Sequence, residues 1–169
     1  GLVYVTNAAG DNLVVYDGGA VVERIGVGGT GKNQYDRPHD IEISGGRIYI
    51  ADPGNDRIQV MNKYFRFLTA LGGSAYDFKE PKYLAIDVAG CLLVADQHHD
   101  IVKVFSSDHK LLGTVGSGRR GDGAEDFDRP EGVETWQDLI WISDTYNDRI
   151  VLYRRTEGPG VAGGIAKPC

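Results

Sequence analysis

The stretch GRIYIADPGNDRIQVM, residues 46–61, contains the pattern that decides the fold. Two aliphatic, β-branched runs flank a turn rich in Asp, Pro, Gly and Asn, which predicts two strands joined by a tight turn. The turn and second strand recur as NAAGDNLVVY, DPGNDRIQVM, DQHHDIVKVF and DTYNDRIVLY, which begin at residues 7, 52, 96 and 144. Successive starts lie 45, 44 and 48 residues apart. The chain is therefore built from internal repeats.

Each repeat holds more than this pair of strands. Pro38, Pro81 and Pro130 open a further apolar run, in RPHDIEIS, EPKYLAID and RPEGVETW. In the second repeat, HDIEIS, RIYIAD, RIQVMN and FLTALG predict four consecutive strands. No segment of about 10 to 15 residues carries a sustained helical stripe, so we expect few helices or none. An all-β chain with four strands per repeat is typical of a β-propeller, whose blades bury their faces against one another.

The repeats divide the chain into about four blade units, at residues 1–35, 36–78, 79–127 and 128–157, with a Gly/Pro-rich strand or tail at 158–169. The units resemble NHL repeats, through GRIYIADPGNDRIQVM and through LGGSAYDFKEP with its F-x-x-P motif. The first unit is also similar to the YVTN repeat of another propeller group, through VYVTN at residues 3–7. Because NHL propellers usually have six blades, the resemblance implies part of a larger disc. We expect further blades, another subunit or the tail to cover the open ends.

Composition narrows the function classes. The 169 residues include 18 basic and 24 acidic side chains, for a net charge of −6. This sign disfavours nucleic acid as a partner, because phosphates need cationic surfaces. No apolar run reaches the roughly 18 residues of a membrane span. The chain begins with Gly1, so we expect an upstream segment to be missing. Cys91 and Cys169 do not fix the redox compartment, and our expectation leans to an extracytoplasmic or secreted location.

Two glycine-rich stretches imitate nucleotide-binding loops. GVGGTGKNQ at residues 26–34 matches G-x-x-x-x-G-K, and GSGRRG at residues 116–121 matches G-x-G-x-x-G. A phosphate loop must lead into a helix whose first amides hold the anion. Here a proline and a strand follow, so we interpret both stretches as connections between blades.

A series of aspartates has a structural interpretation. Asp52, Asp96 and Asp144 each end a predicted strand, where a carboxylate can accept backbone hydrogen bonds and fix a turn. Arg57 and Arg149, five residues further on, are predicted to reach carboxylates or carbonyls with their planar guanidinium groups.

Function is expected at equivalent positions that differ between repeats. After the prolines stand His39, Lys82 and Glu131, which blade geometry should bring toward one mouth of the axial channel. We predict a binding site there. Further candidates on the loop faces are Tyr35, Tyr76, Tyr146, His98 and His99. This arrangement favours a non-enzymatic interaction scaffold that binds a protein partner.

The alternative is a metal-dependent lyase or hydrolase. The segment PHDI at residues 38–41 resembles part of the peptide-amidating lyases, propellers that bind zinc through histidines near the axis. The resemblance implies that His39 is a metal ligand. A catalytic zinc needs about three protein ligands, and the equivalents of His39 are Lys82 and Glu131, which do not complete such a set. We assign no catalytic residue and favour a protein that is not an enzyme and has no cofactor.

Two further hypotheses rest on charged clusters. Calcium is suggested by Asp122, Glu125, Asp126 and Asp128, although these residues lack the spacing of a loop that wraps the ion. An RNA-binding NHL propeller is the second alternative function. It would use a local basic face at Arg119, Arg120, Arg154 and Arg155.

Overall fold

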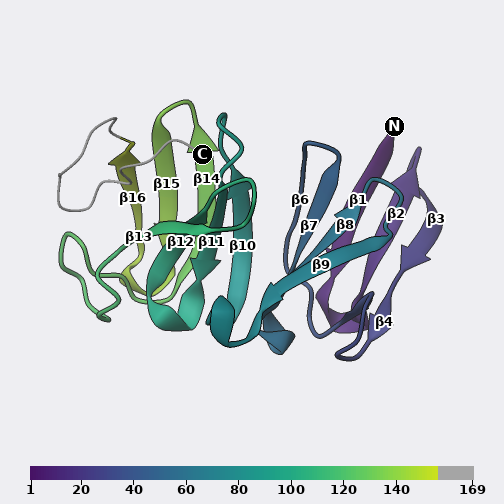
Figure 1. Cartoon of the computed structure of the whole chain (residues 1–169), viewed down its shortest axis with the longest axis horizontal. Helices are drawn as coiled ribbons and strands as arrows, with labels where there is room; N and C mark the ends of the chain where they lie inside the picture. The colour runs from purple at the N-terminus through teal and green to yellow at the C-terminus, as the bar shows by residue number, and fades with distance from the viewer. Residues whose placement is uncertain (156–169) are drawn as a thin grey trace. The chain divides into compact units, whose positions relative to one another are not determined.

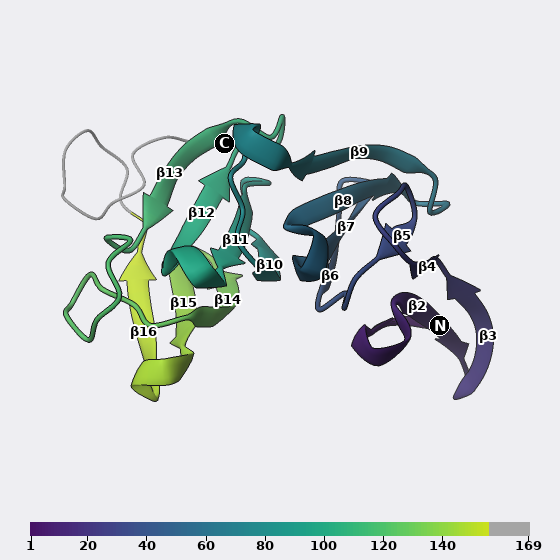
Figure 2. The same cartoon turned by 90° about the horizontal axis from the view of Figure 1, so that it is seen from below.

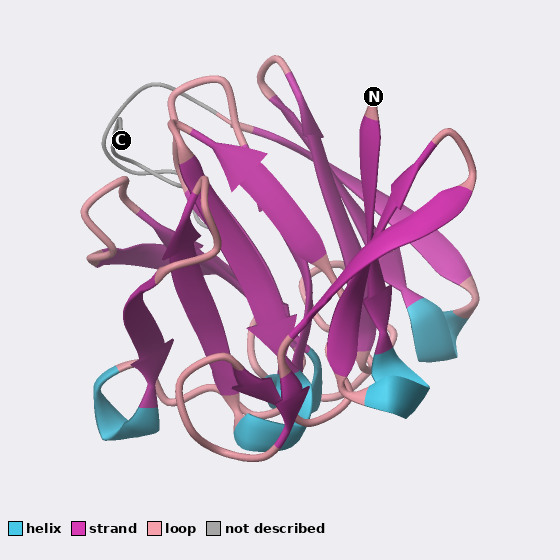
Figure 3. Cartoon of the chain, turned by 90° about the vertical axis from the view of Figure 1, so that its right-hand side faces the viewer, coloured by secondary structure: helices cyan, strands magenta, loops and turns pink. Residues whose placement is uncertain are grey.

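A computed structural model of the chain describes residues 1–155, which fold into two compact units divided between Glu80 and Pro81. Among these residues, strands and turns account for almost all regular structure. The helical segments there are five 3-10 turns of three residues each, which lie at strand ends (Figure 3). They are η1 (Ala8–Gly10), η2 (Pro53–Asn55), η3 (Gly73–Ala75), η4 (Gln97–His99) and η5 (Thr145–Asn147). No helix within residues 1–155 is long or apolar enough to cross a membrane.

The first unit contains two antiparallel sheets (Figure 1). The first sheet has the strand order β1-β2-β3 and the second sheet has the order β6-β7-β8-β9, while β4 and β5 form a small parallel pair. The strands are β1 (Leu2–Asn7), β2 (Asn12–Asp17), β3 (Ala20–Ile25), β4 (Val27–Gly28), β5 (Gln34–Tyr35), β6 (Ile41–Ser44), β7 (Arg47–Asp52), β8 (Arg57–Asn62) and β9 (Phe67–Gly72).

The second unit repeats this organisation (Figure 2). Its third sheet has the order β10-β11-β12-β13 and its fourth sheet has the order β14-β15-β16. The strands are β10 (Pro81–Ile86), β11 (Leu92–Asp96), β12 (Ile101–Phe105), β13 (Leu111–Val115), β14 (Pro130–Trp136), β15 (Leu139–Asp144) and β16 (Arg149–Arg154). Each sheet is a meander of sequential neighbours, as the four-strand repeat predicts.

The four strands predicted in the second repeat are confirmed. β6 begins at Ile41 rather than at His39, but the backbone amide of His39 still donates to the carbonyl of Ala51 at 3.1 Å. The β7–β8 hairpin pairs Asp52 with Arg57 across its turn. The predicted strand or tail at residues 158–169 lies outside the described residues.

Each unit has its own apolar core between two sheets. In the first unit, Leu13 and Val15 of the first sheet pack with Ile48, Ile50 and other residues of the second. In the second unit, the core joins the third and fourth sheets in the same manner, with Val102 and Val104 against Ile140 and Ile142. Alternate residues of a strand point to opposite faces, and the central strands β8 and β12 each carry one buried polar side chain, Gln59 and Lys103, among their apolar residues.

Candidate functional site

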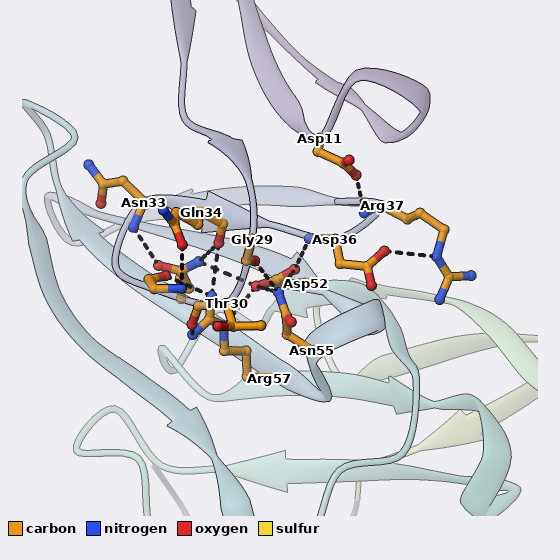
Figure 4. Close-up of polar contacts among 12 residues, drawn as sticks. Asp11, Gly29, Thr30, Asn33, Gln34, Asp36, Arg37, Asp52, Asn55 and Arg57 are labelled. Atoms are coloured by element: carbon orange, nitrogen blue, oxygen red, sulfur yellow. Dashed lines mark hydrogen bonds and ion pairs between the residues drawn. The ribbon is translucent and has the colours of Figure 1, made fainter.

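The best-connected polar group of the first unit is the carboxylate of Asp52, at the end of β7 (Figure 4). The side chain is fully buried. Its Oδ1 accepts the backbone N–H of Asp36 at 2.7 Å and the Asn55 amide at 3.0 Å. Its Oδ2 accepts Arg57 Nε at 2.7 Å and Gln59 Nε2 at 3.3 Å. The carboxylate thereby holds the η2 turn and the end of the preceding glycine-rich loop.

The glycine-rich loop of residues 26–34 is bound by protein side chains. Arg57 Nη1 donates to the carbonyl of Thr30 at 2.6 Å, and Nη2 donates to the carbonyls of Gly31 and Gln34 at 2.9 and 2.8 Å. The Asn55 amide adds a bond to the carbonyl of Gly29 at 2.9 Å. The loop thus presents carbonyl oxygens to a cation, whereas a phosphate loop presents N–H groups to an anion. Its interpretation as a structural connection is supported.

The fourth repeat builds the same network around Asp144, which is also fully buried. Arg149 Nε donates to Asp144 Oδ2 at 2.8 Å. Its Nη atoms donate to the carbonyls of Asp122 and Gly123 at 2.7 and 2.9 Å. Asn147 Nδ2 donates to the carbonyl of Gly121 at 2.7 Å, so the network binds the end of the second glycine-rich stretch and the residues that follow it. The predicted roles of Arg57 and Arg149 are both confirmed.

The third repeat keeps the carboxylate and changes its partners. Ile101 occupies the position of Arg57, and the basic side chain of this repeat is Lys103, two residues further along β12. Lys103 Nζ lies 2.7 Å from Asp96 Oδ2, and His99 Nδ1 lies 2.8 Å from the same oxygen. Both Asp96 and Lys103 are buried. A buried carboxylate needs a paired charge, and Lys103 supplies it where the arginine is missing.

Sequence reasoning missed a second aspartate series. Asp11, Asp56 and Asp100 end their 3-10 turns with φ values of 50°, 49° and 55°, a conformation that Asp tolerates well. The Oδ1 atom of each accepts the backbone N–H of the residue before a repeat proline. The distances are 2.8 Å for Asp11 to Arg37, 2.7 Å for Asp56 to Glu80 and 2.9 Å for Asp100 to Arg129. The signal was present, because every aligned segment has Asp at its fifth position.

The prediction that Tyr35 belongs to a loop face is wrong. Tyr35 is fully buried and packs in the apolar core of the first unit. A Cβ placed on Gly26 would lie 2.3 Å from its ring, so the glycine makes room for the aromatic side chain. Phe78 and Phe127 occupy the equivalent repeat positions and are buried as well. The aromatic residue of the F-x-x-P motif is a core residue.

Replacing Tyr35 by Phe is expected to raise the free energy of unfolding by about 1 kcal/mol. The Tyr35 hydroxyl is buried without a hydrogen-bond partner among the described residues. Burial raises the pKa of this hydroxyl, the Asp52 carboxylate raises it further, and Arg57 lowers it. Urea denaturation of Tyr35→Phe would measure the effect, with the exposed Tyr64→Phe as a control expected to change little. A marked loss of stability in Tyr35→Phe would show that the hydroxyl has a partner.

The structure brings together two of the three predicted axial-mouth residues. Lys82 Nζ lies 2.9 Å from Glu131 Oε1, and Gln97 Nε2 donates to the same oxygen at 2.6 Å. Lys82 follows the first residue of β10, Glu131 follows the first residue of β14, and Gln97 begins η4. Gln97 is buried, whereas the side chains of Lys82 and Glu131 are 16% and 30% exposed. The result is a polar cluster that solvent reaches at the ends of two adjacent inner strands.

His39, the third predicted residue, lies in the first unit on the segment that leads into β6. Its backbone is fixed, since its N–H donates to Ala51 and its carbonyl accepts Thr6 Oγ1 at 3.0 Å. The side chain is half-buried. Within residues 1–155, no three His, Cys, Asp or Glu side chains are grouped so that they could hold a metal ion. The zinc hypothesis for His39 thus gains no further ligand in the described part of the chain, and the acidic residues 122–128 form no calcium cage there.

The other loop-face candidates differ in their exposure to solvent and in the side chains that they contact. Tyr146 is 55% exposed, and Arg129 lies over its ring at 4.1 Å from the centroid. Tyr76 is half-buried and stacks on Phe78 with ring centroids 6.1 Å apart. His98 and His99 are half-buried in η4, and His99 belongs to the Asp96 network. Tyr146 is the candidate that most resembles an exposed contact residue.

The basic face suggested by four arginines is neutralised. Arg119 pairs with Asp126 at 3.5 Å, and Arg120 pairs with Asp128 at 3.2 Å. Arg154 forms an ion pair with Asp138, and Arg155 forms one with Asp87. A guanidinium group that already has a carboxylate partner contributes less to phosphate binding. The RNA hypothesis is weakened by these pairs.

Comparison with known proteins identifies the fold but no relative in sequence. No protein-family model matches the chain, and no curated protein sequence matches it. A streptogramin B lyase is similar in structure, with a TM-score of 0.67, 15% identity, and coverage of 91% of this chain and 51% of that chain. A chain of the nidogen/laminin complex has a TM-score of 0.68, 13% identity and coverage of 90% and 55%.

An auxiliary nutrient binding protein from Bacteroides thetaiotaomicron is similar as well, with a TM-score of 0.65, 16% identity and coverage of 89% and 44%. The chain thus spans about half the length of the solved structures that it matches. Among these neighbours are a lyase and a binding protein, so the likeness concerns the fold alone. Together with the four meander sheets and the repeat of about 45 residues, it shows that the chain folds as about four blades of a β-propeller.

Proposed function

We propose that this chain is a non-enzymatic interaction module of the NHL class, which binds a protein partner at the polar cluster of Lys82, Gln97 and Glu131. The observation that carries the proposal is the pairing of Lys82 with Glu131 at a solvent-reached position. Lys82 Nζ has three donors and Glu131 has a second carboxylate oxygen. The cluster can therefore offer both a donor and an acceptor to a polar group of a partner.

Two further observations support a binding role. Tyr146 with Arg129 adds an exposed aromatic side chain of the kind enriched at protein interfaces. The nidogen/laminin complex shows that a protein of similar fold takes part in a protein complex.

Replacing Lys82 by Ala is expected to weaken partner binding at least about tenfold while lowering the free energy of unfolding by about 1 kcal/mol or less. The pair is only partly desolvated, so its contribution to folding is small. The partner is first identified by crosslinking and mass spectrometry of the native protein, and binding is then measured by calorimetry. Lys110→Ala is the control, because Lys110 is 80% exposed and pairs with Asp108 on a turn. Equal affinity of Lys82→Ala and wild type would refute the proposed site.

A metal-dependent lyase is the second candidate function, motivated by His39 and by the lyases of similar fold. It predicts one zinc ion per chain in the native protein, and loss of that zinc in His39→Ala. Elemental analysis of the purified native protein distinguishes the two functions. Stoichiometric zinc that depends on His39 would favour the lyase or hydrolase, whereas metal-free protein that retains its partner would favour the interaction module.

A further inference from the structure

The first unit contains a pocket of about 360 Å³ that belongs to none of the sites described above. It lies between the first sheet and the β8–β9 turn of the second sheet. Strands β1, β2 and β3 contribute Tyr4, Val15 and Glu23 to its lining, and the turn contributes Lys63, Tyr64 and Phe65. The volume is in the range of pockets that hold small molecules, roughly 300 to 1,000 Å³.

The inner part of the pocket is apolar and aromatic. Val15 is buried, and Tyr4 and Phe65 are half-buried, with their ring centroids 5.3 Å apart. Tyr64 is 69% exposed, so its ring marks the solvent side of the pocket. An aromatic group that enters the pocket therefore meets rings and an aliphatic side chain, with which aromatic groups pack favourably.

Two opposite charges lie on the lining of the same pocket. Glu23 and Lys63 are both exposed. Within residues 1–155, Glu23 has no hydrogen-bond or ion-pair partner, and Lys63 has no carboxylate partner. The Lys63 ammonium instead lies over the Tyr64 ring, 5.0 Å from its centroid. One acidic and one basic group are thus available to a ligand.

The turn that supplies the aromatic and basic residues departs from its equivalent in the third sheet. Phe65 and His109 occupy the same position, because the N–H of each donates to the carbonyl three residues earlier, at 2.9 and 2.8 Å. Both have positive φ, 54° and 66°. A bulky aromatic residue adopts this conformation at a cost that Gly or Asn avoids. Such strain is typical of positions where a side chain has a role beyond the turn itself.

Glu23 is likewise specific to the first sheet. It lies opposite Val15, which packs in the core between the first and second sheets. The residues equivalent to Val15 in the second and third sheets lie opposite Thr69 and Gly113. The repeat therefore does not need a carboxylate at this position. A carboxylate beside an aromatic surface is suited to an ammonium group.

We propose that this pocket binds a free aromatic α-amino acid in its zwitterionic form. The ring of the ligand packs on Tyr4 and Phe65, its ammonium group pairs with Glu23, and its carboxylate pairs with Lys63. The two charges of the pocket favour a ligand that carries both, because a ligand with one charge leaves one side chain unpaired. The site shares no residue with the polar cluster at Lys82 and does not depend on partner binding there.

Binding of L-phenylalanine to the full chain, followed by NMR, tests the proposal. The ligand is expected to shift the amide resonances of Tyr64 and Phe65, with a Kd of about 1 mM or lower. L-phenylalaninamide lacks the carboxylate and resembles the first residue of a peptide. N-acetyl-L-phenylalanine lacks the ammonium group and resembles the last. Each is expected to bind about threefold to fivefold more weakly than the free amino acid, since one exposed ion pair is lost.

Two variants assign the charges. Glu23→Gln is expected to weaken L-phenylalanine and its amide about threefold to fivefold, and to leave the N-acetyl compound unchanged. Lys63→Met is expected to weaken L-phenylalanine and the N-acetyl compound and to leave the amide unchanged. A misfolded pocket would weaken all three ligands, so this crossed pattern separates recognition of charge from damage to the fold. Arg66→Met is the control, because Arg66 is exposed in the same turn and does not line the pocket.

The proposal is overturned if L-phenylalanine shifts neither Tyr64 nor Phe65 at concentrations well above the expected Kd. It is also overturned if either blocked compound binds as tightly as the free amino acid, which would indicate a chain terminus as the ligand. Unchanged affinity for L-phenylalanine in Glu23→Gln or in Lys63→Met would overturn it as well.

Discussion

Replacing Asp52 by Ala is expected to lower the free energy of unfolding by about 3 to 5 kcal/mol. The carboxylate is fully buried and is the common acceptor for Arg57, Asn55, Gln59 and the Asp36 amide. Its removal leaves the guanidinium group without its anion and leaves buried donors unsatisfied. The η2 turn and the glycine-rich loop lose their common anchor in the same step.

Urea denaturation followed by circular dichroism measures this loss. Asp17→Ala is the control, because Asp17 is 59% exposed, and its effect should stay within about 0.5 kcal/mol. Asp52→Asn keeps the side-chain volume and one acceptor oxygen, so its free energy of unfolding should lie between those of Asp52→Ala and Asp17→Ala. It should also remain folded if the Ala variant does not fold. Equal stability of Asp52→Ala and Asp17→Ala would mean that the network does not stabilise the fold.

Replacing Gly116 by Ala is expected to cost about 1 to 3 kcal/mol more than replacing Gly118 by Ala. Both glycines have positive φ, 99° and 75°, so both variants bear backbone strain. Only at Gly116 would the new Cβ collide, at 2.7 Å from the buried Phe127 ring and 3.2 Å from the Asp100 carbonyl. At Gly118 the nearest atom lies 3.8 Å away.

Comparing the two variants separates the cost of close packing from the cost of backbone strain, because both glycines lie in one loop and only Gly116 packs against the Phe127 ring. Thermal unfolding of the two variants under the same conditions is sufficient. If Gly116→Ala and Gly118→Ala lose the same stability, close packing of the loop on Phe127 is not what requires glycine at residue 116.

Much of the fold could be predicted from local pattern. The alternation of apolar residues and the spacing of turns predicted the strands of the second repeat within two residues, because strand formation depends on neighbours along the chain. The roles of Asp52 and Arg57 were also predictable, since a tight turn between two paired strands brings residues five apart into hydrogen-bond distance. The glycine-rich loops could be separated from nucleotide loops because a strand follows them.

The candidate site could be predicted from the sequence only in part. The positions of Lys82 and Glu131 followed from the repeats, but their direct ion pair joins residues 49 positions apart. The burial of Tyr35 was missed because an aromatic residue in a polar loop sequence looks exposed until the core beneath it is known. The pairing of Lys103 with Asp96 in the third repeat was also missed. Lys103 stands two positions further along the repeat than Arg57, and only the paired strands show that a cation at either position can reach the aspartate at the end of the preceding strand.

The sequence by itself determined the class of fold, the number of repeats, the turn residues and the aspartates on which the turns depend. These features are set by backbone preferences and by the two-residue period of strands, which act over a few residues. The tertiary structure decided which aromatic residues are buried and which charges are paired. Those properties depend on contacts between segments tens of residues apart, where small differences among repeats change the partner of a side chain without changing the strand that carries it.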